Sequence, residues 1–162
     1  MKIVATSAVT LTVLALWLMP ALAQAPPPGF PNVVGALKTT PGCLGVETAQ
    51  TPDGKRIIFA WFENKKSIVD WYYSEVHQAA MKTVFPNLTF DRQPLPDLTD
   101  DSGPILAIVS VKFVETRMAS IGIELYGPLP GGVAVGGRFA PDAVKVRGLR
   151  EIPLGATQGV SR

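Results

Sequence analysis

Residues 56–63 read RIIFAWFE, and this stretch decides the fold. A strand whose two faces are both apolar is covered by other elements on both sides of its sheet. We therefore expect a central strand here. The apolar residues alternate between two sides: Ile57, Phe59 and Trp61 on one, and Ile58, Ala60 and Phe62 on the other.

The residues before this strand predict its partner. Cys43–Thr51 has the composition of a second strand, and Pro52-Asp53-Gly54-Lys55 lies between the two. Proline presets one backbone dihedral and glycine allows a positive φ, so this tetrapeptide is expected to form a turn. The two strands therefore predict a β-hairpin.

Helical segments flank the hairpin on both sides. Asn32 is a capping residue for a short helix over Val33–Lys38. Asn64 is a capping residue for one longer helix from Lys65 to about Val84. At 100° per residue this helix has an apolar face that would pack on a sheet. The face comprises Ile68, Val69, Tyr72, Tyr73, Val76, Ala79, Ala80 and Thr83.

The second half of the chain is predicted to be rich in β-structure. Residues 86–104 contain four prolines and are expected to form a long surface loop. Ile105–Val114 is a strongly apolar strand, and Ser120–Tyr126 alternates so that one of its faces is expected to meet water. Val133–Phe139 and Ala143–Leu149 are expected to be further short strands.

The N-terminus predicts a secretory signal peptide over residues 1–23. A positive start at Lys2 precedes an uncharged apolar run, and Ala21-Leu22-Ala23 supplies the small residues that a signal peptidase reads. Cleavage after Ala25 is a second reading of this site, and an uncleaved membrane anchor is the alternative to cleavage. The expected protein is secreted or periplasmic, with no stable membrane anchor after cleavage.

The mature chain is expected to comprise one folded domain. A proline-rich mobile lead over residues 24–31 precedes a single α+β domain over 32–154, and a frayed tail occupies 155–162. The 162-residue chain carries 15 basic and 13 acidic residues, a near balance that gives no electrostatic reason for nucleic-acid binding.

The chain has few residues of the types that form catalytic and metal sites. Its single cysteine, Cys43, cannot form an internal disulfide and is interpreted as a buried small hydrophobic residue. A zinc site needs several histidine or cysteine ligands, and only one of each is present. No metal or other cofactor is therefore predicted.

The candidate site lies in residues 70–81, DWYYSEVHQAAM, which contain the only histidine. On the predicted helix His77 lies at the edge of the apolar face, with Tyr73 one turn before it, Met81 one turn after it, and Trp71 on the opposite border. A pKa near neutrality suits histidine to proton transfer. The structural alternative is a half-buried histidine with one nitrogen hydrogen-bonded.

Residues 41–82 combine three features: PGCLGVE, an apolar strand that ends in WFEN, and a helix with the pattern W-x-x-S-x-x-H. Together they resemble the antibiotic-biosynthesis-monooxygenase-like proteins, which are small members of the dimeric α+β barrel, or ferredoxin-like, superfamily. The resemblance covers about a third of the mature chain. The matching residues are Pro41, Gly42, Cys43, Leu44, Gly45, Trp61, Glu63, Trp71, Ser74, Glu75 and His77.

The resemblance implies a ferredoxin-like antiparallel sheet packed by helices, a homodimer, and a pocket between helices and sheet. Some members oxidise aromatic substrates with oxygen alone, and others degrade haem. Two departures stand out. The strand that normally opens the family fold is missing here, so 105–114 or a later strand would fill its place. Met81 stands where the haem-degrading members have their iron-binding histidine, so haem degradation is not predicted.

These observations predict a protein that binds, or oxidises, a small hydrophobic or aromatic molecule between sheet and helix. In an oxidation His77 would act as the catalytic base. The alternative is a non-catalytic periplasmic module for binding or self-association. The predicted substrate-binding residues are Trp61, Trp71, Tyr72, Tyr73 and Met81.

Overall fold

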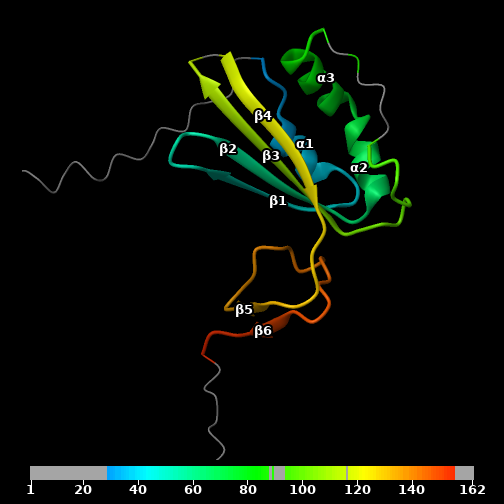
Figure 1. Ribbon diagram of the computed structural model, residues 1–162, viewed down its shortest axis with the longest axis vertical. Helices are drawn as coiled ribbons and strands as arrows, with labels where there is room; N and C mark the ends of the chain where they lie inside the picture. The colour runs from blue at the N-terminus through cyan, green and yellow to red at the C-terminus, as the bar shows by residue number, and fades with distance from the viewer. Residues whose placement is uncertain (1–28, 88, 90–93, 116, 156–162) are drawn as a thin grey trace, which may run out of the picture.

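The computed structural model describes residues 29–87, 89, 94–115 and 117–155. The predicted signal peptide, most of the proline-rich lead and all but the first residue of the predicted tail lie outside these residues. The described chain is an α+β fold with a four-stranded antiparallel sheet and three helices (Figure 1). The predicted α+β class is therefore confirmed. The three helices and the sheet are compatible with a ferredoxin-like arrangement, which in its finer detail stays a prediction.

The sheet is built from two hairpins that pair side by side. β1 (Cys43–Gln50) and β2 (Arg56–Phe62) form the predicted hairpin, and β3 (Ile105–Val114) and β4 (Arg117–Tyr126) form a second one. β2 pairs with β3, so the strand order is β1-β2-β3-β4 and all neighbours are antiparallel. β2 is thus an inner strand, as its sequence predicts, and β3 lies beside it.

The three helices lie on one side of the sheet (Figure 1). α1 (Val33–Thr39) starts at Asn32, whose side chain accepts a hydrogen bond from Gly35 N at 2.9 Å, as predicted for a cap. Alternate residues of β2 and β3 contribute to the core on this face. The buried core residues are Leu37, Ala60, Phe62, Ile68, Trp71, Ile105 and Ala107.

The single helix predicted over residues 65–84 is wrong. The chain instead forms α2 (Lys65–Tyr72) and α3 (Glu75–Val84), with a break at Tyr73 and Ser74. Ser74 caps the second helix, because its hydroxyl accepts a hydrogen bond from His77 N at 3.3 Å. A helical wheel cannot be continued across this break.

The break also changes which side chains are buried. Trp71 and Met81, predicted at the borders of the apolar face, are both buried. Ala79, Thr83 and Tyr73, predicted on the buried face, are exposed. The surface of the helices that faces the sheet therefore consists of two short stripes, one from each helix.

The C-terminal segment covers part of the other face of the sheet. The ring of Phe139 packs edge-to-face on Phe59 of β2, with centroids 4.9 Å apart. Gly45 of β1 lies directly under Pro141, where a side chain would clash. Trp61, which points to the same side as Phe59, is only 7% exposed. Both faces of β2 are covered in this region, as its sequence predicts.

The predicted C-terminal strands are present in shorter form. β5 (Val133–Val135) pairs in parallel with β6 (Arg150–Ile152), and both lie beyond the end of β4 (Figure 1). The strand predicted over 133–139 ends early because Gly136 and Gly137 adopt positive φ angles. The strand predicted over 143–149 is displaced to β6.

The loop between α3 and β3 is anchored by the N-terminus of α2. The ammonium group of Lys65, a residue only 4% exposed, donates to the carbonyl of Leu98 at 2.6 Å and lies 3.5 Å from the Asp100 carboxylate. The backbone N–H of Lys65 donates to Ser102 O at 2.8 Å. Lys65 therefore makes three contacts that hold the described end of the long loop against α2.

Within the described ranges, no helix has the length and apolar character needed to cross a membrane.

We predict that Lys65→Met lowers the free energy of unfolding by about 2 kcal/mol, because the Leu98 carbonyl loses a charged donor. Methionine keeps the buried aliphatic stem, so the change isolates the ammonium group. Chemical denaturation followed by circular dichroism measures the difference.

Lys66→Met is the matched control. Lys66 is exposed and its ammonium group pairs with Asp70 at 2.7 Å one helical turn away, a solvent-screened contact that contributes little to stability. Equal losses in the two variants would contradict the anchoring role of Lys65.

Candidate functional site

The predicted catalytic residue His77 lies in the first turn of α3, beside the end of α2. Its Nδ1 lies 2.8 Å from the carbonyl oxygen of Tyr72, which belongs to the last turn of α2. Gln78 Nε2 donates to the same carbonyl at 2.5 Å. A carbonyl can only accept, so Nδ1 carries the proton and donates. The imidazole therefore joins the two short helices across their break.

Aromatic rings surround this imidazole. The ring centroid of Trp71 lies 5.5 Å from that of His77, and the Tyr72 ring lies 5.2 Å away. Burial disfavours the imidazolium and lowers the pKa of His77 below its ordinary value, while the hydrogen bond to the Tyr72 carbonyl opposes this shift. Near neutral pH the ring is thus uncharged, half-buried and bonded through one nitrogen.

The structure brings only some of the predicted site residues together. His77, Trp71 and Tyr72 form one cluster, and Tyr73 joins its edge through a perpendicular contact with the Tyr72 ring at 5.0 Å. Trp61 is not part of it, because strand alternation places its side chain on the face of the sheet opposite Phe62 and the helical core. Neither of the two grooves identified among the described residues is lined by any of the six predicted site residues, Met81 included.

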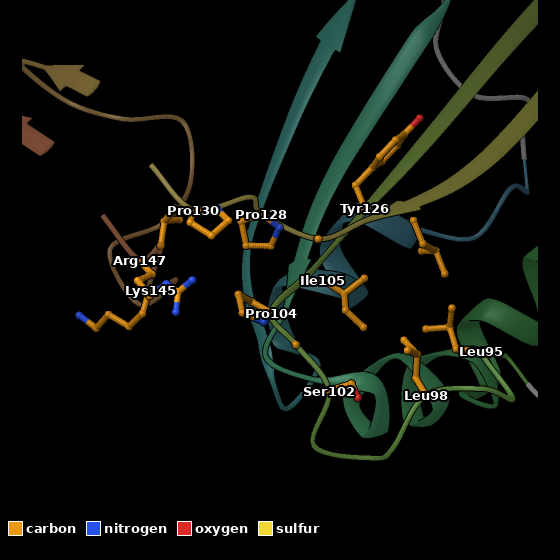
Figure 2. Close-up of a pocket in the computed structure, with 14 residues that line it drawn as sticks. Leu95, Leu98, Ser102, Pro104, Ile105, Tyr126, Pro128, Pro130, Lys145 and Arg147 are labelled. Carbon is orange, nitrogen blue, oxygen red and sulfur yellow. The ribbon is translucent and has the colours of Figure 1, made fainter. Parts of the chain in front are cut away.

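One groove lies at the end of the sheet, between the long loop and the C-terminal segment (Figure 2). It has a volume of about 410 Å³, within the range of small-molecule sites. Its apolar part is formed by the loop and by the adjoining ends of β3 and β4. The residues of this part include Leu95, Leu98, Pro104, Ile105, Leu125 and Pro128.

The loop wall is held in place from both sides. Leu95 packs against the helical core, and the Leu98 carbonyl is bound by the Lys65 ammonium group at 2.6 Å. Gly103 passes so close to the backbone of Glu63 that a side chain there would clash. The apolar wall is thus fixed by the same contacts that hold the loop to the sheet.

The opposite wall carries positive charge. Lys145 and Arg147 line it, and in Figure 2 they lie on the other side of the groove from Leu95 and Leu98, with the side chain of Lys145 extending away from the leucines. The N–H of Gly131 donates to Arg147 O at 2.7 Å, which fixes this stretch beside the linker that follows β4. No ion pair of Lys145 or Arg147 is found within the described ranges, and no acidic residue lines this groove.

Sequence reasoning missed this groove. The sequence predicts only a surface loop over residues 86–104, and Leu95 and Leu98 show no periodicity that predicts a site. The cationic residues lie some fifty positions further along the chain, so no local spacing connects them to the leucines. The available signal was the pair of leucines in a stretch otherwise rich in acids and prolines.

The described residues contain no group of three or more histidine, cysteine or acidic side chains that could hold a metal ion. Cys43 is half-buried, and burial raises the pKa of its thiol, so near neutral pH it is a protonated thiol in the helix-facing core.

Comparison with protein-family models, with curated proteins and with solved structures finds no match for this chain. The resemblance to the antibiotic-biosynthesis-monooxygenase-like proteins therefore stays a prediction from residues 41–82, and so does the catalytic role of His77.

We predict that the stability of the protein falls as the pH drops below about 6.5, the ordinary pKa of histidine. Since the folded state lowers the pKa of His77, the unfolded chain takes up the proton first. The stabilisation by the neutral ring is fully present above that pH and is lost as the pH falls towards the folded-state pKa.

His77→Asn tests this, because the asparagine amide can donate to the Tyr72 carbonyl but does not titrate. Unfolding free energies at about pH 7.5 and about pH 5 are compared for the two proteins, a window that spans the ordinary histidine pKa. The variant should lose less stability over this window. An identical loss in both would show that other groups cause it.

Proposed function

We propose that this protein binds a small, mostly apolar molecule that carries an anionic group, in the groove between the long loop and the C-terminal segment. The observation that carries the proposal is the division of the groove into an apolar wall and a cationic wall. Small-molecule sites combine apolar surface with a few charged groups that fix the orientation of the ligand.

The apolar part of the ligand lies against Leu95, Leu98 and Ile105. Ile105 is itself buried, whereas Leu98 is exposed. Covering exposed apolar surface is favourable at about 25 cal/mol per Å². A short alkyl chain or a bicyclic aromatic ring system matches a groove of about 410 Å³.

The anionic group of the ligand pairs with Lys145 and Arg147. Guanidinium groups bind carboxylates and sulfonates through two parallel hydrogen bonds. Tyr126 also lines the groove, and its hydroxyl donates to Glu124, a bond that raises the pKa of the phenol and keeps it protonated. The ligand class is therefore that of small aliphatic or aromatic acids.

This proposal keeps the predicted ligand chemistry, a small hydrophobic or aromatic molecule, and moves its site. The cluster of His77, Trp71 and Tyr72 is packed from several sides, whereas the groove is open to solvent on its outer side. Binding alone is proposed, and no reaction is assigned to the groove.

We predict that decanoate and 1-naphthoate bind the protein, and that Lys145→Ala/Arg147→Ala weakens their binding by tenfold or more, on the order of 1.4 kcal/mol. The uncharged analogues 1-decanol and 1-naphthalenemethanol should bind both proteins equally, because they use only the apolar wall. Isothermal titration calorimetry measures all four compounds.

Two further variants sharpen the result. Arg150→Ala removes a cation from the same segment that does not line the groove, and it should leave binding unchanged. Leu98→Ala should weaken the acids and the alcohols alike. Acid binding that survives loss of both Lys145 and Arg147, or no binding to the unaltered protein, would overturn the proposal.

A further inference from the structure

β4 is a long strand at the edge of the sheet. It extends over ten residues, Arg117–Tyr126, and pairs with β3 on one side only, with no described strand on its other side. A typical strand has five or six residues. The N–H and C=O groups on the outer edge of such a strand are unpaired and can bind a further strand.

The side chains of β4 leave apolar surface uncovered. Pairing with Val111, Val109 and Ala107 places Ile121, Ile123 and Leu125 on the helix-facing side. Ile123 is nevertheless 50% exposed, because α1 packs on β1 and α2 on β2 rather than on this edge. The other edge strand, β1, instead ends in the exposed and largely polar residues 47–50.

The pairing with β3 defines positions along β4. Lys112 pairs with Ser120 and Phe113 with Met118, so Ala119 is the extra residue of a bulge. When Ala119 is left out, Met118 is the next ladder position after Ser120, and the pairs below are counted in this way. Arg117, Ser120, Gly122 and Glu124 consequently share the face opposite the helices.

A second copy of β4 can pair antiparallel with the first about a two-fold axis at Ile121. Residues directly opposite each other then lie on the same face of the combined sheet. Gly122 lies opposite Ser120 of the second copy, Ile123 opposite Met118, and Glu124 opposite Arg117. Because the axis is two-fold, each of these pairs occurs twice.

The charges select this register. With the axis at Ile121, the acidic residue and the basic residue of β4 face each other in both pairs. With the axis at Gly122, Glu124 would face Ser120 and Arg117 would face Tyr126, so neither charge would be matched. Opposite charges across a ladder are favourable, and like charges are unfavourable. The exposed Ile123 side chains would meanwhile be partly covered by the Met118 side chains.

We propose that two copies of this chain join edge to edge along β4, in the register centred on Ile121, and form one continuous eight-stranded sheet. The interaction buries the free edge of β4 and part of its exposed apolar side. The pairs that define the register involve residues 117–124, whereas only the last two residues of β4, Leu125 and Tyr126, line the ligand groove, so either proposal can fail without the other.

Disulfide cross-linking tests the register. In a Cys43→Ala background, Ile121→Cys places two thiols opposite each other at the axis, where antiparallel Cα atoms are about 5 Å apart. Mild oxidation should yield a covalent dimer on non-reducing gels. Ile123→Cys is the matched control, since its two copies would be separated by four ladder positions, roughly 13 Å. A failure of Ile121→Cys to cross-link, or equal cross-linking of both variants, would overturn the register.

Charge reversal tests the pairing without a covalent bond. Glu124→Arg and Arg117→Glu should each weaken the dimer about tenfold, and the double variant should restore it, because the pairs are then reversed in sign. Sedimentation equilibrium measures the dissociation constants. Tyr126→Phe removes the hydroxyl that bonds Glu124 but changes no charge, and it should leave the dimer intact.

Two outcomes would sink the proposal. One is a wild-type protein that stays monomeric at about 100 μM, where a dimer of micromolar affinity would dominate. The other is a double variant that stays as weak as the single ones, which would show that the two charges do not face each other.

Discussion

The rest of the structure depends on the need to cover both faces of β2. Its alternate residues are apolar without interruption, and an inner strand of this kind is stable only between two layers. The helices cover Phe62 and Ala60 on one side, and the C-terminal segment covers Phe59 and Trp61 on the other. The helices and the C-terminal segment, which come from opposite ends of the domain, are therefore both needed to bury the side chains of β2.

The groove is a consequence of these two layers. The loop that leaves the helical layer must return to the sheet at β3, and the linker that leaves β4 must pass to the opposite face. Both pass the same end of the sheet. Lys65 fixes the first segment through Leu98, and the backbone bond between Gly131 and Arg147 fixes the second. The space that remains between them is lined by leucines from one segment and cations from the other.

Local signals in the sequence predict much of this fold. Asn32 and Asn64 cap helices as expected, and the turn at Asp53-Gly54 joins the predicted hairpin. The helix break at Ser74 was missed because the apolar periodicity continues through it, although a serine followed by an acid is itself a helix start. The site was missed for a different reason. Its two walls meet only through tertiary packing, which no spacing of residues along the chain records.

The order of the strands also bears on how the chain folds. Each hairpin joins strands that are close in sequence, whereas the pairing of Phe62 with Ile105 closes a loop that contains two helices and the long loop. Closing that loop costs chain entropy before the contacts between β2 and β3 compensate for it. The two hairpins are thus the parts that can form early, and we expect the pairing of β2 with β3 to be the slower step.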